Sequence, residues 1–86
     1  MSWFVYMLRC GDDTLYTGIT DDVARRFEKH CAGKGAKYTR GRGPLELVYI
    51  QEIADKSGAL KREIEIKRLP REKKIQLCEH WRKETE

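Results

Sequence analysis

Two short apolar segments separated by a turn constrain the fold of this chain more than any other feature. Residues 3–9 (WFVYMLR) are aromatic, β-branched or otherwise apolar at nearly every position, which is typical of a buried strand. Residues 10–14 (CGDDT) have the composition of a turn, and residues 15–19 (LYTGI) predict the returning strand. We therefore expect a β-hairpin with one tyrosine, Tyr6 or Tyr16, in each strand.

The rest of the chain predicts one more strand and three helices. Thr20-Asp21-Asp22 is typical of a helix cap, and an apolar stripe follows it at helical spacing. The stripe comprises Val23, Ala24, Phe27 and Cys31. Further elements are expected as a strand at 45–53, a helix at 56–69 and a helix from Pro70 to about Glu84.

The resulting order, β-β-α-β-α-α, predicts the α+β class. Three strands form a stable sheet only when helices cover it, so we expect a small, mainly antiparallel three-stranded sheet flanked by helices. A chain of 86 residues has room for one such core, and residues 1–86 are therefore expected to form a single domain.

The net charge of +4 and the isoelectric point of about 9.1 favour a polyanionic partner. Nucleic acid is the first candidate and an anionic membrane the second. A charge of this size is equally consistent with solubility alone, so the position of the cations must decide.

The three cysteines, Cys10, Cys31 and Cys78, lack the spacing of a zinc site. We expect them to be buried, reduced thiols in a cytoplasmic protein. The apolar run at 3–8 is too short for a signal peptide or a membrane span, so no membrane partner is expected.

Glu63 is the acidic residue whose position is least expected. Ala59, Leu60, Ile64 and Ile66 define one apolar arc of the predicted helix, and Glu63 falls within it. A carboxylate on a buried face requires a partner. An ion pair with Lys67 or with Arg26 is the more common solution, and a metal ligand at the floor of a cleft is the functional one.

Five other residues are candidates for the same cleft. Tyr6 and Tyr16 can face the same side of the hairpin, where a phenol could orient or deprotonate water; sheet packing is the simpler interpretation. Gly18 weakens a strand unless another group approaches it closely. Arg26 and His30 are four residues apart and lie together on one helix edge, where arginine suits phosphate and where solvent exposure is the simpler interpretation.

Residues 33–43 (GKGAKYTRGRG) form a basic, glycine-rich loop without an acidic residue. Its cations suit phosphates, its glycines allow close approach, and Tyr38 could stack on a base. A flexible, solubilising loop is the alternative. The candidate nucleic-acid contacts are Gly18, Lys34, Lys37, Tyr38, Arg40 and Arg42.

In the order of its candidate residues the chain resembles the GIY-YIG nuclease domain family, and within it the small stand-alone bacterial members of the UPF0213-like group. The two name tripeptides correspond to Phe4-Val5-Tyr6 and Tyr16-Thr17-Gly18. The segments HCAGKGAKYTR (30–40) and ALKREIEIK (59–67) are similar to the helix end, loop and glutamate helix of that group. The resemblance covers nearly the whole chain.

The resemblance implies an antiparallel three-stranded sheet and hydrolysis of DNA phosphodiester bonds with one divalent metal, Mg²⁺ or Mn²⁺. Glu63 would hold the metal, Tyr6 would act as base or position water with Tyr16 as its partner, and Arg26 would stabilise phosphoryl charge. His30 would support the tyrosine or transfer protons. Structure-specific cleavage in DNA repair or recombination is the implied role.

The chain also departs from this family. The first tripeptide lacks its glycine, the second has Thr17 at its centre, and no asparagine occurs anywhere, although many members carry one near the site. Targeting would have to come from a partner protein, from self-association or from the loop at 34–42. A non-catalytic nucleic-acid-binding module and an RNA-directed nuclease are the alternatives.

Overall fold

The computed structural model describes residues 2–85 and has the predicted order of elements. A short 3₁₀ turn, η1, interrupts the basic loop. The elements are β1 (Trp3–Arg9), β2 (Leu15–Thr20), α1 (Val23–Cys31), η1 (Lys37–Thr39), β3 (Glu46–Ile53), α2 (Lys56–Lys67) and α3 (Arg71–Thr85). The predicted class is confirmed, with boundaries that differ by one or two residues.

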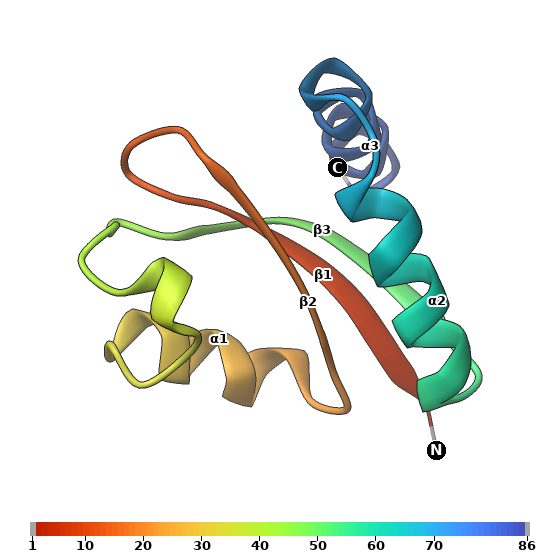
Figure 1. Ribbon diagram of the computed structural model, residues 1–86, viewed down its shortest axis with the longest axis horizontal. Coiled ribbons are helices and arrows are strands. Elements are labelled where there is room, and N and C mark those ends of the chain that lie inside the picture. The colour runs from red at the N-terminus through yellow and green to blue at the C-terminus, as the bar shows by residue number, and fades with distance from the viewer. Residues whose placement is uncertain (1, 86) are drawn as a thin grey trace.

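The sheet is antiparallel throughout, in the order β2-β1-β3. The hairpin pairs Tyr6 with Gly18 and Leu8 with Tyr16. Because β1 is paired on both sides, its residues have the most constrained positions in the molecule. Figure 1 shows α1 on one side of the sheet and α2 with α3 on the other.

Side chains of β1 alternate between these two sides, as strand geometry requires. Val5 and Met7 face α2 and α3 and are fully buried with Ala59 and Ile66 in the hydrophobic core. Tyr6, its register partner Gly18, and Tyr16 two residues before that glycine face the side of α1. The apolar core and the candidate site therefore lie on opposite faces of one sheet.

Helix α1 begins where predicted, because the Asp22 side chain accepts a hydrogen bond from the Arg25 backbone N–H at 3.1 Å. The predicted apolar stripe is partly wrong. Ala24 and Cys31 are exposed, and His30 is the buried residue of the helix. Ala24 and Cys31 have small side chains, so burying them would remove little apolar area from water. The buried position is taken by His30, because the Tyr6 hydroxyl requires a hydrogen-bonding partner.

The burial predicted for the cysteines is likewise only partly correct. Cys10 is buried, Cys78 is half-buried and Cys31 is exposed. All three are free thiols. Cys31 is exposed because it lies one residue beyond His30, on the side of α1 that faces away from the sheet.

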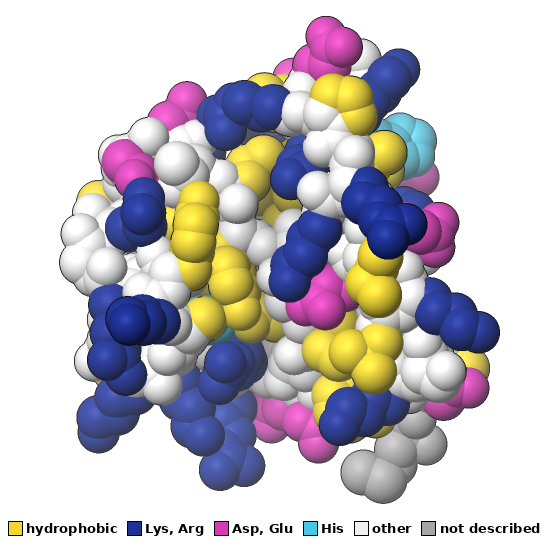
Figure 2. Space-filling model, viewed as in Figure 1, with side chains coloured by type: hydrophobic (Ala, Val, Ile, Leu, Met, Phe, Trp, Pro, Cys, Tyr) yellow, Lys and Arg dark blue, Asp and Glu magenta, His cyan; other side chains and the backbone are white. Residues whose placement is uncertain are grey.

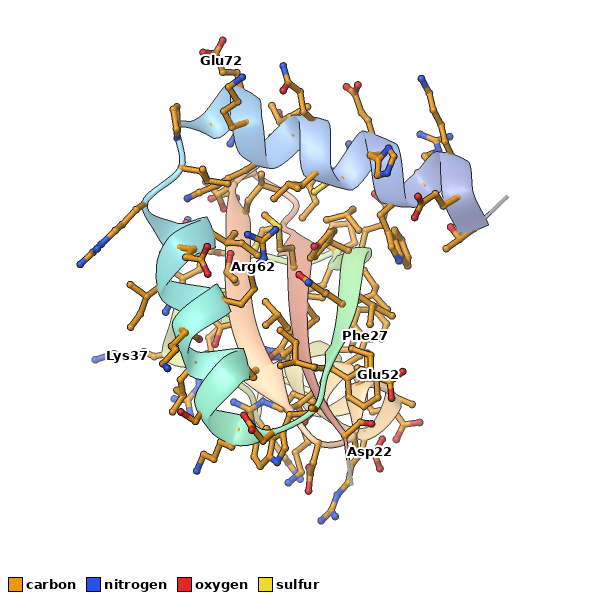
Figure 3. The ribbon with its side chains drawn as sticks, turned by 90° about the vertical axis from the view of Figure 1, so that its right-hand side faces the viewer. Asp22, Phe27, Lys37, Glu52, Arg62 and Glu72 are labelled. Carbon is orange, nitrogen blue, oxygen red and sulfur yellow. The ribbon has the colours of Figure 1, made fainter. Side chains whose placement is uncertain are left out.

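Helix α2 is capped by Asp55, whose side chain accepts from the Gly58 backbone N–H at 2.7 Å. Its buried residues are Ala59 and Ile66, whereas Leu60 and Ile64 are exposed, so the predicted apolar arc was placed too far around the helix. The inward face is instead completed by the partly buried Arg62 and Glu63. Figure 3 shows Arg62 reaching over the sheet, where its Nε donates to Gln51 Oε1 at 2.9 Å.

The end of the basic loop is fastened to the hairpin turn. The Gly11 backbone N–H donates to the Arg42 carbonyl at 2.5 Å, and the Arg42 guanidinium forms an ion pair with Asp12 at 2.5 Å. Thus the loop is anchored at both ends, by α1 before it and by the hairpin turn and β3 after it.

The two isoleucines of α2 provide a test of this packing. Ile66→Ala is expected to lower the free energy of unfolding by about 2–5 kcal/mol, because it removes a fully buried side chain. Ile64→Ala removes the same atoms from a side chain that is 48% exposed and should cost less than about 1 kcal/mol. Urea denaturation of both variants measures the difference, and equal losses would contradict the assigned face.

Candidate active site

The candidate site is built around Tyr6 in the central strand. Tyr6 is 2% exposed, and its hydroxyl lies 2.7 Å from His30 Nε2. Burial raises the pKa of Tyr6 to about 12, and interaction with the neighbouring Arg26 guanidinium opposes this increase. The phenol is therefore neutral near pH 7 and is already hydrogen-bonded.

Gly18 leaves the space that the Tyr6 hydroxyl occupies. A Cβ atom at position 18 would lie 2.7 Å from Tyr6 Oη, 2.9 Å from its Cζ and 3.1 Å from Cε2 of Tyr16. Any side chain here would displace the phenol from His30. The glycine two residues after the second tyrosine is thus explained by close approach of a side chain from the neighbouring strand.

His30 is held from both ring nitrogens. Its Nε2 contacts Tyr6, and its Nδ1 lies 2.9 Å from Oγ1 of Thr39, a buried residue of η1. Burial first, and the charge of Arg26 second, lower the pKa of His30 below its usual value. The imidazole is therefore neutral at physiological pH, as a proton acceptor must be.

Tyr16 and Tyr38 extend this cluster toward solvent. The Tyr16 ring lies edge-on to His30 with 5.3 Å between centroids, and it stacks on Tyr38 at 5.8 Å. The Arg42 guanidinium lies over the Tyr38 ring, 4.6 Å from its centroid. Tyr38 and Arg42 thus form the wall of the site, and stacking of Tyr38 on a nucleobase stays a prediction.

Glu63 approaches from a different direction. It belongs to α2, which packs on β2 and β1 from the core side of the sheet. Its carboxylate is 18% exposed and pairs with Lys67 Nζ at 3.5 Å, the ion pair that its spacing predicts. In residues 2–85 no hydrogen bond or ion pair connects Glu63 to Tyr6, Tyr16 or His30.

The donor set around Glu63 limits which metal it could hold. Within the described chain, no three His, Cys, Asp or Glu side chains are placed to share an ion. A single carboxylate fits Mg²⁺ or Mn²⁺, which keep water ligands and take oxygens from a phosphate. It does not fit a zinc cage.

Cations surround the entrance on the side of α1. Figure 2 shows Lys and Arg side chains gathered over the region where Figure 1 places α1 and the following loop. Lys37 projects outward in Figure 3. The exposed cations of this surface, which we call the basic surface, are Arg25, Lys29, Lys34, Lys37 and Arg40. Arg25 and Lys29 were not singled out from the sequence; their separation of four residues within the predicted helix was the available signal.

A recess of about 480 Å³ lies elsewhere, between α3 and the ends of β1 and β3. Leu47, Ile75 and Trp81 line it together with the ion pair of Arg9 and Glu46. None of the candidate site residues borders it. The candidate site is therefore distinct from this recess. No helix within residues 2–85 has the length and apolarity needed to cross a bilayer.

Comparison with known proteins shows the family of the chain. The model of the GIY-YIG catalytic domain matches residues 2–76. The chain belongs to the GIY-YIG family. A UPF0213 protein of Oceanobacillus iheyensis is 49% identical over 94% of both chains, and a UPF0213 protein of Haloquadratum walsbyi is 55% identical over 88% of this chain and 85% of its own.

Two solved structures are also similar. The solution NMR structure of UPF0213 protein BH0048 from Bacillus halodurans is 53% identical, covers 90% of this chain and 82% of that one, and has a TM-score of 0.57. The NMR structure of EF2693 from E. faecalis is 33% identical, covers 95% and 88%, and has a TM-score of 0.64. This GIY-YIG chain is thus similar to UPF0213 proteins over most of its length, and GIY-YIG nucleases generally use a divalent metal.

The lowered pKa of His30 makes stability depend on pH. The unfolded chain binds a proton near the ordinary histidine pKa of 6.5, whereas the folded chain binds it only at lower pH. The unfolded state thus holds more protons below about pH 6.5, and the free energy of unfolding should fall as the pH decreases.

Denaturation between about pH 7 and about pH 5.5 tests this expectation. His30→Gln should reduce the pH dependence. His80→Gln is the matched control, because the His80 side chain is 74% exposed, and it should leave the dependence as in the wild type. Identical slopes for the wild type and His30→Gln would contradict a neutral, buried His30.

Proposed function

We propose that this chain is a divalent-metal-dependent endonuclease that hydrolyses DNA phosphodiester bonds. The observation that supports it most is the buried hydrogen bond between Tyr6 and a neutral His30, beside Arg26, in a GIY-YIG chain. Branched or otherwise distorted DNA is the proposed substrate, with a role in repair or recombination.

The pKa of Tyr6 shapes this mechanism. With a pKa of about 12, only about one Tyr6 in 100,000 is ionised at pH 7. A preformed phenolate therefore contributes little. Tyr6 would accept a proton from the attacking water while passing its own proton to His30 Nε2, which gives a neutral tyrosine and an imidazolium.

Arg26 and Glu63 would stabilise negative charge on the phosphate, Arg26 directly and Glu63 through the cation that it holds. Arg26 already lies beside the Tyr6 hydroxyl, so its guanidinium could donate to phosphoryl oxygens that develop charge at this point. Glu63 would hold the divalent cation in exchange for Lys67, and a bound cation would supply Lewis-acid stabilisation of the phosphate and leaving oxygen. A phosphate over the β2 edge would lie between the two groups.

A non-catalytic nucleic-acid-binding module is the second candidate. It is favoured by the ion pair of Glu63 with Lys67 and by the lack of asparagine in the chain. In such a module the cations would bind phosphates and the tyrosine cluster would only support the loop. Replacement of Glu63 would then leave nucleic-acid binding by the protein unchanged and would affect only its stability.

Cleavage of labelled single-stranded, duplex and branched DNA, with RNA of the same sequences, distinguishes these candidates. Glu63→Gln and Tyr6→Phe are each expected to lower the cleavage rate by at least about 100-fold in Mg²⁺ or Mn²⁺, and EDTA should abolish it. Affinity for the substrate should change little.

Two matched variants control this experiment. Glu65→Gln removes an exposed carboxylate from the same helix, and Tyr49→Phe removes a hydroxyl from the other face of the sheet. Both should cleave like the wild type. No cleavage by any protein, with salt-sensitive binding by all, would favour the binding module, and preferential cutting of RNA would redirect the substrate assignment.

The basic surface generates a separate prediction about binding. Replacing Lys34, Lys37 and Arg40 together by alanine should weaken binding and reduce the slope of log K against log salt by roughly two to three units. Arg42 is left intact because its guanidinium is engaged by Asp12 and Tyr38.

The control for this triple variant removes three lysines of α3, Lys73, Lys74 and Lys83, and therefore has the same net charge. Because α3 lies on the other side of the sheet, this control should bind with nearly the wild-type salt dependence. Equal effects of the two triple variants would mean that total charge, rather than the basic surface, determines binding.

A further inference from the structure

The hydroxyl of Thr39 lies between a backbone carbonyl and the ring of His30. Thr39 is 3% exposed, and its Oγ1 lies 2.9 Å from the carbonyl oxygen of Ala36 and 2.9 Å from His30 Nδ1. A carbonyl oxygen can only accept, so both contacts are hydrogen bonds at the same time only when the Thr39 hydroxyl donates to Ala36. The single proton of the hydroxyl is then used, and its oxygen faces Nδ1 as an acceptor.

The direction of this hydrogen bond determines which ring nitrogen of His30 carries a proton. His30 Nδ1 must carry a proton in order to donate to Thr39 Oγ1. In a neutral ring Nε2 is then bare, and it accepts from the Tyr6 hydroxyl at 2.7 Å. The chain of donors therefore runs one way, from Tyr6 to His30, from His30 to Thr39, and from Thr39 to Ala36.

We propose that Thr39 is a positioning residue that fixes the Nδ1–H tautomer of His30, so that Nε2 is free to take the proton of Tyr6. The opposite tautomer would place a proton on Nε2, and Tyr6 would have to accept from the ring. Tyr6 could then no longer pass its proton on. The proposal deepens the proposed nuclease function and rests on it for the rate effects.

The loop closes on His30 closely enough to hold this arrangement. A Cβ atom at Gly35 would lie 2.7 Å from His30 Cγ and 2.9 Å from its Cα, and still closer to Nδ1. Only glycine lets residues 35–39 pass over the imidazole at this distance. The segment that carries Lys34, Lys37 and Arg40 is thus also the segment that orients the proton acceptor.

The tautomer can be measured directly by long-range ¹H–¹⁵N correlation NMR on protein labelled with ¹⁵N-histidine. The wild type should show a protonated Nδ1 and a bare Nε2 at His30. His80, the second histidine and largely exposed, serves as the internal reference. Thr39→Val should lose the Nδ1–H preference, whereas Thr39→Ser, which keeps the hydroxyl, should retain it.

Cleavage kinetics give the second readout. Thr39→Val should lower kcat by roughly 10- to 100-fold with little change in KM, and Thr39→Ser should recover most of it. Thr17→Val, a buried threonine on the opposite face of the sheet, is the matched control and should retain wild-type kcat. Gly35→Ala should act like Thr39→Val, because it pushes the loop away from His30.

The two readouts separate failure of this proposal from failure of the nuclease function. An Nε2–H tautomer in the wild type, or Nδ1–H retained in Thr39→Val together with wild-type kcat, would overturn the role of Thr39. The predicted tautomer changes in a wild-type protein that cuts no substrate would support Thr39 as the positioning residue and overturn the nuclease function alone.

Discussion

The hydrogen bond between Tyr6 and His30 is the interaction on which the rest of the site depends. It joins the most constrained strand of the sheet to the last turn of α1, and both partners are 2% exposed. It exists only because Gly18 leaves room for the phenol and Gly35 leaves room for the loop over the imidazole. Two glycines with ordinary backbone conformations are thus required by side-chain contacts, not by their own dihedral angles.

Burial gives this pair its chemical character. It raises the pKa of the phenol and lowers the pKa of the imidazole, so both groups are neutral over the physiological range. A neutral pair can move a proton only if the acceptor nitrogen is bare when the substrate arrives. The tautomer of His30 is then as important as its pKa, and we propose that the Thr39 hydroxyl and the Ala36 carbonyl determine it.

The sequence predicted the sheet and the order of helices correctly, because strand and helix periodicities are local properties of the residues. It misplaced the inward faces of α1 and α2 because Ala24, Cys31, Leu60 and Ile64 were counted as apolar without regard to what they would meet. Thr39 could not be identified, since a threonine in an irregular loop has no periodic signal. The distance of Glu63 from the tyrosines depends on how α2 packs against β2, which the spacing within one helix does not determine.

The two faces of the sheet differ in role, one holding the apolar core and the other the polar site. This difference explains how so small a chain can maintain a polar site. Val5, Met7, Ala59 and Ile66 bury the apolar area on the side of α2 and α3, so the other face need not contribute an apolar core. On that face, order comes from directional contacts: Asp12 with Arg42, Arg42 with Tyr38, Tyr38 with Tyr16, and Thr39 with His30. Directional contacts hold atoms in position without removing them from water entirely. Such contacts can hold the buried Tyr6 oxygen and His30 nitrogen in a defined protonation state.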